Sequence, residues 1–285
     1  MEKQISLFDM ELPPQSEIKE IYQKELKNNN HKAEKINFAR VPDNEPKIKY
    51  EKIPTINEIV KLLDNFTYKV GIHEILSDIF KLGAIAISNK FDKTQAKERE
   101  EQYKKTILKY DKKGRYLIAE IFTKIYILLA SSVNNGFDDY LGEIYMSSQT
   151  SNNKAGQFFT PYNVSKVCAE MSINSEIVSE YMEQDRIFTL NEPACGSGGM
   201  ILAAVDVLYN KYRFNYSRNL LVECSDIDER CVYMTYLQLA CAGVPAIIYQ
   251  RDTLSMKTWQ RWETPAYIMQ WTRFKDVLKQ GDEEK

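Results

Sequence analysis

The chain has 285 residues, of which 44% are apolar, 12% aromatic and 27% charged, a balance typical of globular proteins. Its 38 basic and 40 acidic residues give a net charge of -2, which excludes a global positive field for DNA or an anionic membrane. Five cysteines without a C-x-x-C pair, together with two histidines, argue against a metal site and a disulfide framework and indicate a cytoplasmic setting. Apolar runs shorter than the roughly 18 residues of a bilayer span predict no membrane association.

Residues 1–52 are predicted to form a poorly ordered arm. Prolines interrupt this stretch, which is rich in Lys, Glu and Asn and has little apolar material to pack. Over residues 53–150 the apolar residues recur at the three-and-four spacing of helix faces, which predicts a helical domain. Within it, residues 116–130 are apolar nearly all round, which predicts a buried helix, and residues 137–145 carry an amphipathic stripe.

The segment 90–115 is locally basic, with ten Lys or Arg against five acidic residues. Such a run is typical of a solvated helix face, and it also fits a surface that contacts DNA. Both interpretations stay open at this point.

Residues 151–285 are predicted to form an α/β domain that follows a polar loop. Strands and helices are expected to alternate at 187–191, 200–212, 220–224, 229–242 and 246–249. This order predicts half of a doubly wound parallel sheet, and such sheets bind ligands beyond the carboxyl ends of their strands.

Three glycines fall within four positions directly after the first predicted strand, in Cys195-Gly196-Ser197-Gly198-Gly199. A turn of this kind between strand and helix lets a small charged ligand approach the main chain, and the helix directs free N–H groups at it. An ordinary tight turn would also use these glycines. Ile201 breaks the G-x-G-x-x-G fingerprint, and the G-x-x-x-x-G-K-[ST] phosphate loop is absent from the sequence, so NAD and ATP are disfavoured.

Acidic residues follow the other two strands. Asp226 is expected to accept hydrogen bonds from the hydroxyls of a ribose, whereas Asp228 is placed to cap the helix that follows. Asp252 ends the third strand, where its carboxylate either accepts from an exocyclic amine or serves as an ordinary turn acid.

The order of these motifs resembles one known family. The motifs are Gly156-Gln157-Phe158-Phe159-Thr160-Pro161, Glu192-Pro193-Ala194-Cys195-Gly196-Ser197-Gly198-Gly199, Asp226-Ile227-Asp228 and Asp252-Thr253-Leu254. Together they are similar to the S-adenosylmethionine-dependent adenine-N6 DNA methylases, and in particular to the modification subunit of type I restriction systems. The resemblance covers about residues 139–254. It implies a Rossmann-like methyltransferase fold with a truncated parallel sheet, S-adenosylmethionine (SAM) as the cofactor and DNA as a partner.

The resemblance assigns one group of residues to the methionine end of SAM. Thr160 and Pro161 would meet it, with Phe158 or Phe159 packed beside it. Glu192, where the family usually has Asp, would reach the ammonium group. The remaining contacts would come from the turn, at Ala194, Cys195, Gly196, Ser197 and Gly198. Taken alone, Thr160-Pro161 also fits a helix cap followed by a first-turn proline.

A second group would hold the nucleoside end of SAM. In this reading Asp226 binds the ribose, Ile227 contacts the adenine ring, and Asp252 accepts from the adenine amino group. Thr253 completes the predicted contacts.

The catalytic signature of the family, (Asp or Asn)-Pro-Pro-(Tyr or Phe), is absent from this sequence. In the family it positions the target amine and stacks the flipped base. If residues 266–270 form the fourth strand, Phe274 provides the one matching aromatic ring. The other placement, Thr264–Tyr267, follows a segment, 257–263, that we expect to be too polar for a buried strand.

Two functions are therefore predicted. The first is a DNA adenine-N6 methyltransferase that depends on a partner or on unusual catalytic residues, and the second is a catalytically incomplete SAM-binding module. A methyltransferase for RNA or protein is a third, more distant option. Because few residues follow the predicted motifs, the edge of the sheet beside the first strand is expected to be covered by a partner or a second copy.

The arm contains a further motif, Gln4-Ile5-Ser6-Leu7-Phe8. It is similar to the Gln-x-x-Leu-Phe peptides with which bacterial DNA enzymes dock on the replication sliding clamp. The alternative is a chance pentapeptide that packs on its own domain.

Overall fold

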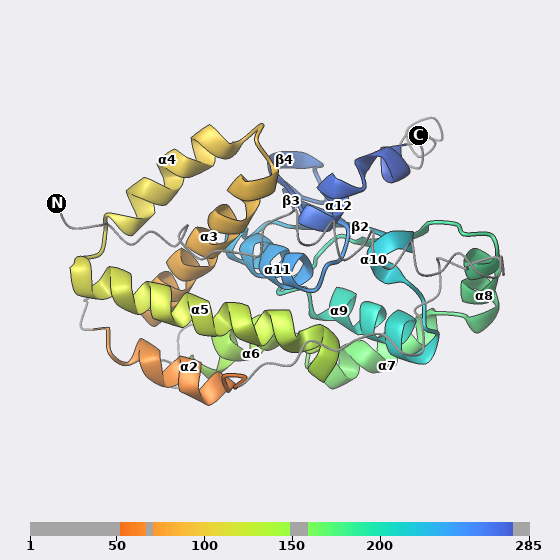
Figure 1. Ribbon diagram of the computed structural model, residues 1–285, viewed down its shortest axis with the longest axis horizontal. Helices are drawn as coiled ribbons and strands as arrows, with labels where there is room; N and C mark the ends of the chain where they lie inside the picture. The colour runs from red at the N-terminus through yellow and green to blue at the C-terminus, as the bar shows by residue number, and fades with distance from the viewer. Residues whose placement is uncertain (1–51, 67–70, 149–158, 276–285) are drawn as a thin grey trace, which may run out of the picture.

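The computed structural model describes residues 52–66, 71–148 and 159–275, and every structural statement below refers to these ranges. The predicted arm, with Gln4, Leu7 and Phe8, lies outside them except for its last residue. Figure 1 shows the helices between residues 56 and 135 gathered at one end of the molecule and those between residues 162 and 219 at the other, with the sheet and the helix Glu229–Cys241 between them.

The described part of the predicted helical region consists of helices: α2 Ile56–Leu63, α3 Ile72–Phe91, α4 Ala96–Ile107, α5 Lys112–Asn135 and α6 Tyr140–Ser147. Side-chain caps fix several of their starts. The Thr55 hydroxyl accepts from Glu58 N, and the Glu58 carboxylate accepts from Thr55 N, which forms a capping box at α2. Asp111 and Asp139 cap α5 and α6 in the same sense.

Helix α5 is the central helix of this part. Its side chains Ile118, Ile121 and Ile125 are fully buried, and it packs against α2, α3 and α11. By length and composition it would be long and apolar enough to cross a membrane, which differs from the expectation drawn from the sequence. Of its most apolar stretch, 44% is buried inside the described fold.

The sheet has the order β1-β2-β3-β4, with β1 Phe188–Glu192, β2 Leu220–Asp226, β3 Ala246–Asp252 and β4 Lys257–Glu263. The first three strands are parallel, as the alternation in the sequence predicts, and β4 runs antiparallel to β3. Helices α9 Gly199–Asp206 and α11 Glu229–Cys241 make the crossovers, and a π-helical turn, η2 Val207–Lys211, extends α9. The chain thus has a mixed α/β, Rossmann-like architecture.

One hydrophobic core joins the helical part to the sheet. Buried side chains of α3, α5 and α6 belong to the same cluster as Val222 of β2 and Ile248 of β3. Helix α11 makes this junction, because it contacts β2 and β3 on one side and α3, α5 and α6 on the other. On the opposite face of the sheet a small second cluster contains Leu221, Ile247, Tyr267 and Phe274.

One expectation about the last part of the chain is wrong: Pro265–Met269 form helix α12 where a fourth strand is expected from the sequence. The fourth strand is β4, at residues 257–263, and it is mostly exposed, in line with a segment too polar for a buried strand. Strand β4 tolerates its polar sequence because it lies at the edge of the sheet, where Trp262 is its one buried residue. Thr264 caps α12 through its hydroxyl, and Pro265 at the first helical position favours a helix start.

The start of α7 also differs by one residue from the prediction. The helix spans Tyr162–Ser172, and Pro161 occupies the N-cap position without a side-chain cap. Pro161 has an extended backbone, with ψ at 136°, so Thr160 lies outside the helix and does not cap it. Helix α8 Ser175–Glu183 and the short α10 Tyr216–Asn219 complete the described fold.

Candidate cofactor-binding site

The carboxyl ends of β1, β2 and β3 meet in one site. Gly196 N, in the turn after β1, donates to the Asp226 carboxylate at the end of β2 over 2.9 Å. Thr253, which follows β3, donates from its hydroxyl to Pro193 O over 2.7 Å. These contacts bring together the three segments that the sequence predicts as ligand-binding.

The glycine turn has a defined main-chain shape. Gly196 and Gly198 have φ angles of 55° and 97°, which side chains with a Cβ rarely adopt. The Thr235 hydroxyl of α11 donates to Gly196 O over 2.9 Å and so fixes one peptide of the turn. A Cβ on Gly196 would lie 3.2 Å from the ring of Phe159, so the missing side chain lets this ring approach the turn.

Asp226 and its neighbour suit the nucleoside end of a ligand. One oxygen of the half-buried Asp226 carboxylate accepts from Gly196 N and the other from Asp228 N, at 2.9 Å each. Each carboxylate oxygen has a second lone pair, so both can still accept from hydroxyl groups. Ile227 leaves 62% of its surface exposed beside them, and such a side chain offers an apolar platform for a flat ring.

The other acids of the site stabilise local turns. Asp252 accepts from Leu254 N over 3.0 Å and from the Ser255 hydroxyl over 2.8 Å. These hydrogen bonds, with that from Ser255 N, hold the pKa of Asp252 below its ordinary value. Glu192 accepts from Ala194 N over 3.1 Å. A contact of either acid with a ligand stays a prediction.

The aromatic motif before α7 is partly described. Phe158 lies outside the described residues, while Phe159 packs edge-on against Tyr145 of α6 with ring centroids 5.8 Å apart. Phe159 therefore lies between α6 and the glycine turn, on the side where the methionine end of SAM is expected. Thr160 and Pro161 follow at the start of α7, exposed to solvent.

The helix cap predicted for Asp228 is confirmed. Its carboxylate accepts from Arg230 N over 2.9 Å and forms an ion pair with the Arg230 guanidinium. Arg230 also donates to the Tyr145 hydroxyl over 3.0 Å. The pKa of Asp228 lies below its ordinary value, because these hydrogen bonds and the Arg230 charge outweigh the effect of burial.

Three polar residues of the site are absent from the predicted set: Asp139, Thr235 and Gln238. Asp139 is buried and accepts from the Ser197 hydroxyl, and Gln238 donates to Ser197 O over 2.7 Å. The sequence gives only a weak indication of a role for Asp139, because an Asp at the start of a predicted helix is a candidate N-cap. Gln238 and Thr235 lie inside α11, where the sequence gives no sign that they face a turn 40 residues away in the chain.

Phe274 lies away from the carboxyl ends of the strands. It is fully buried and stacks on Tyr267, with ring centroids 5.9 Å apart. Its cluster includes Leu221 and Ile247, which stand near the amino ends of β2 and β3. Its assignment to base stacking depended on a fourth strand at residues 266–270, and with α12 in that place the assignment loses its structural basis.

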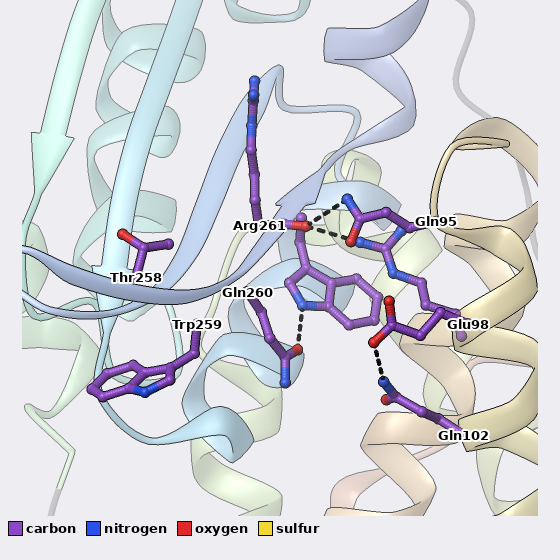
Figure 2. A pocket seen from close by; sticks show the side chains of 9 residues that line it. Gln95, Glu98, Gln102, Thr258, Trp259, Gln260 and Arg261 are labelled. Carbon is purple, nitrogen blue, oxygen red and sulfur yellow. Dashed lines mark hydrogen bonds between the residues drawn. The ribbon is translucent and has the colours of Figure 1, made fainter.

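A hollow with a volume of about 240 Å³ lies elsewhere, between α4 and β4. Figure 2 shows Gln95, which directly precedes α4, reaching toward Arg261 of β4, with Glu98 and Gln102 along α4. Gln95 and the buried Arg99 both donate to Arg261 O, at 3.3 and 2.9 Å. These hydrogen bonds join the start of α4 to the edge strand β4, and we call this contact region the seam between α4 and β4. None of the predicted cofactor residues lines the hollow there.

Comparison with known proteins identifies the family of the chain. Residues 137–282 match the model of a family described as N-6 DNA methylase. A search of curated proteins finds no match. Among solved structures, the methyltransferase subunit of a type I restriction-modification system from Streptococcus thermophilus is similar, with 19% identity and a TM-score of 0.36 over 72% of this chain. This chain spans 40% of the length of that subunit. Since the family model covers half of the sequence and every described residue of the site, the chain belongs to the N-6 DNA methylase family.

Proposed function

We propose that the protein binds SAM at the carboxyl ends of β1, β2 and β3 and takes part in the methylation of adenine N6 in DNA. The observation that carries the proposal is the hydrogen bond of Gly196 N to Asp226, which joins the glycine turn to the strand-end acid in one half-buried site. Family membership supports SAM as the ligand, because transfer of a methyl group to adenine needs a methyl donor.

The described residues fit such a ligand at both of its ends. Asp226 would accept from the ribose hydroxyls, and the exposed Ile227 would support the adenine ring. At the methionine end, the main chain of Gly196 to Gly198 would face the ligand, with Phe159 beside it and Glu192 directed at the ammonium. Ala194, Cys195 and Thr253 shape the same turn, and Thr253 does so by its bond to Pro193.

When bound, SAM would supply an electrophilic methyl group for the transfer. The residues at the strand ends of this chain would bind and orient the cofactor, which contributes to rate by positioning. Positioning of the target amine needs a hydrogen-bond acceptor, and the family tetrapeptide that provides it is absent from the sequence. We therefore assign this task to a partner protein or a second copy of the chain, which would act with it on DNA in the cytoplasm.

A second candidate is a SAM-binding module without transfer activity. The observation that favours it is α12, a helix capped by Thr264 at the position where the catalytic strand was expected. Both candidates share the cofactor site and differ in whether a methyl group reaches DNA.

Calorimetry tests the shared part of the proposal. We expect wild-type protein to bind SAM with micromolar affinity, and Asp226→Ala to lose a charge-assisted hydrogen bond of about 1.5–3 kcal/mol, roughly ten- to a hundred-fold in affinity. Asp64→Ala is the control, because Asp64 is an exposed residue at the end of α2. Absence of heat with wild type, or equal affinity of the Asp226 variant, would contradict the site.

Methyl transfer from radiolabelled SAM to mixed DNA separates the two candidates. The purified chain alone should give little product, since loss of one positioning hydrogen bond typically costs about a hundred- to a thousand-fold in rate. Addition of the proteins encoded beside it should restore transfer if the chain is part of a methyltransferase. SAM binding without transfer under every condition would support the non-catalytic module. Robust transfer by the chain alone would contradict the need for a partner.

A further inference from the structure

Asp139 is a buried acid next to the glycine turn that the proposed function leaves without a role. Its side chain is 6% exposed and caps α6 by accepting from Gly142 N over 3.0 Å. The same carboxylate accepts from the Ser197 hydroxyl and, over 2.9 Å, from the Gln238 amide. It thus bonds to three segments that are far apart in the sequence: α6, the glycine turn and α11.

Gln238 extends this connection to the main chain. Its amide nitrogen donates to Ser197 O over 2.7 Å as well as to Asp139, and its amide oxygen accepts from Leu141 N over 3.3 Å. Ser197 and Gln238 are each 2% exposed. Ser197 is therefore held at both its hydroxyl and its carbonyl, between the two glycines that have positive φ angles.

Two glycines make room for the carboxylate. A Cβ on Gly142 would lie 2.2 Å from Asp139 Oδ2, and a Cβ on Gly199 would lie 2.9 Å from the same atom. Gly199 has an ordinary helical backbone, unlike Gly196 and Gly198, so conformational freedom does not explain it. The third glycine of the motif is instead explained by space for Asp139.

Burying a carboxylate without a cationic partner destabilises the folded state, so a buried acid that only holds a turn needs an explanation. Among the described residues no Lys or Arg forms an ion pair with Asp139, and burial raises its pKa even though three hydrogen bonds oppose the rise. Buried groups with perturbed pKa values are common at functional sites.

From these contacts we infer that Asp139 is a positioning residue for SAM. It acts through Ser197 and Gln238, and it holds the turn from Gly196 to Gly198 in the shape that accepts the methionine end of the cofactor. This inference rests on the proposed function.

The first test measures SAM affinity by calorimetry together with the melting temperature of each ligand-free variant. Asp139→Asn keeps the shape of the side chain and disturbs its acceptor pattern, and Gln238→Met removes the bridge to Ser197 while Asp139 stays intact. We expect each to weaken SAM binding tenfold or more. The control is Asp92→Asn, because Asp92 is also a buried carboxylate, 5% exposed, but it pairs with Arg99 far from the turn. It should lower the melting temperature and leave SAM affinity unchanged.

The second test needs no ligand. Hydrogen–deuterium exchange of the ligand-free protein should show faster exchange in the peptide that covers residues 195–199 for both site variants, with β3 unchanged and with no such change for Asp92→Asn. If wild type binds SAM and both site variants bind it equally well, the positioning role is wrong. If wild type fails to bind SAM, the proposed function is wrong, and unchanged exchange at residues 195–199 would overturn the inference independently.

Discussion

At the scale of single residues, the site separates into side chains that organise the turn and side chains left open to a ligand. Gly196, Thr235 and Asp139 are engaged within the protein. Ile227 is apolar and exposed next to Asp226, and the proposed function gives it a contact with the adenine ring.

Ile227→Ser should weaken SAM binding without unfolding the protein. Removal of most of an apolar contact with the adenine ring costs about 1 kcal/mol, or roughly fivefold in affinity, while exposed substitutions change stability by about 0.5 kcal/mol or less. Ile177→Ser is the matched control, because Ile177 is also an exposed isoleucine, at 47%, and lies in α8, outside the predicted cofactor residues. Equal affinities for SAM in both variants would remove Ile227 from the site.

Gly198→Ala should lower the melting temperature more than Gly243→Ala. Both glycines have positive φ angles, 97° and 69°, so both substitutions introduce backbone strain of about 1 kcal/mol. A Cβ on Gly198 would also lie 3.2 Å from the Thr235 hydroxyl oxygen, whereas nothing lies within 4 Å of a Cβ on Gly243. Equal melting temperatures for the two variants would show that crowding by Thr235 is unimportant.

At the scale of secondary-structure elements, the seam between α4 and β4 ties the helical part to the edge of the sheet. Arg99 is 3% exposed and pairs with Asp92 over 2.8 Å. It donates to Arg261 O over 2.9 Å, and its guanidinium lies 3.9 Å from the centre of the Trp262 ring. The buried Arg99 guanidinium thus makes an ion pair, a hydrogen bond to a main-chain carbonyl of the edge strand and a cation–π contact.

Arg99→Met should destabilise the protein by about 3–5 kcal/mol, because it leaves the Asp92 charge buried without its partner. The double variant with Asp92→Asn should recover part of this loss, since the uncompensated charge is then gone. Urea denaturation at neutral pH measures both values. A double variant as unstable as the single one would mean that the bond to Arg261 O, not the ion pair, carries the effect.

The same pair predicts how stability depends on pH. Burial raises the pKa of Asp92, but its hydrogen bond from Thr94 and the charge of Arg99 outweigh burial, and the folded-state pKa lies below the ordinary value of 3.8. A lowered pKa means that the contribution to stability is complete above 3.8 and is lost as the pH falls through the folded-state value. Urea denaturation of wild type should therefore show a steeper loss below about pH 4 than the Asp92→Asn variant does.

The sequence predicts the parts of the fold and of the candidate site that depend on neighbouring residues, and it does not predict those that depend on contacts between distant segments. The alternation that predicts β1, β2 and β3 is local, and so is the Asp228 cap, and the structure has them within a few residues of the predicted bounds. The polar sequence of 257–263 argues against a buried strand but not against an edge strand, and β4 is an edge strand that buries only Trp262. The contacts of Gln238 were unpredictable, because they depend on how α11 packs against a turn about 40 residues earlier.

At the scale of the whole molecule, charge is unevenly distributed. The net charge of the chain is -2, but the corner where α4 ends and α5 begins carries the exposed Lys105, Lys112 and Lys113. Leu108 and Tyr116 lie exposed among them, at 65% and 55%. We name these three lysines the lysine corner. The proposed function requires contact with DNA, and phosphate contacts depend on local and not net positive charge.

Substitution of all three residues of the lysine corner by Glu should therefore weaken binding to duplex DNA and flatten its dependence on salt. Each lysine that contacts a phosphate contributes about 0.9 to the slope of log K against log salt concentration, so the slope should fall by about 2–3. The control replaces three scattered exposed lysines, Lys61, Lys90 and Lys211, by Glu, which changes the net charge by the same amount. Fluorescence anisotropy with a labelled duplex at several salt concentrations measures both variants. If the control weakens binding as much as the corner variant, net charge governs the interaction and the lysine corner is an ordinary solvated helix end, which is the other interpretation that its sequence allows.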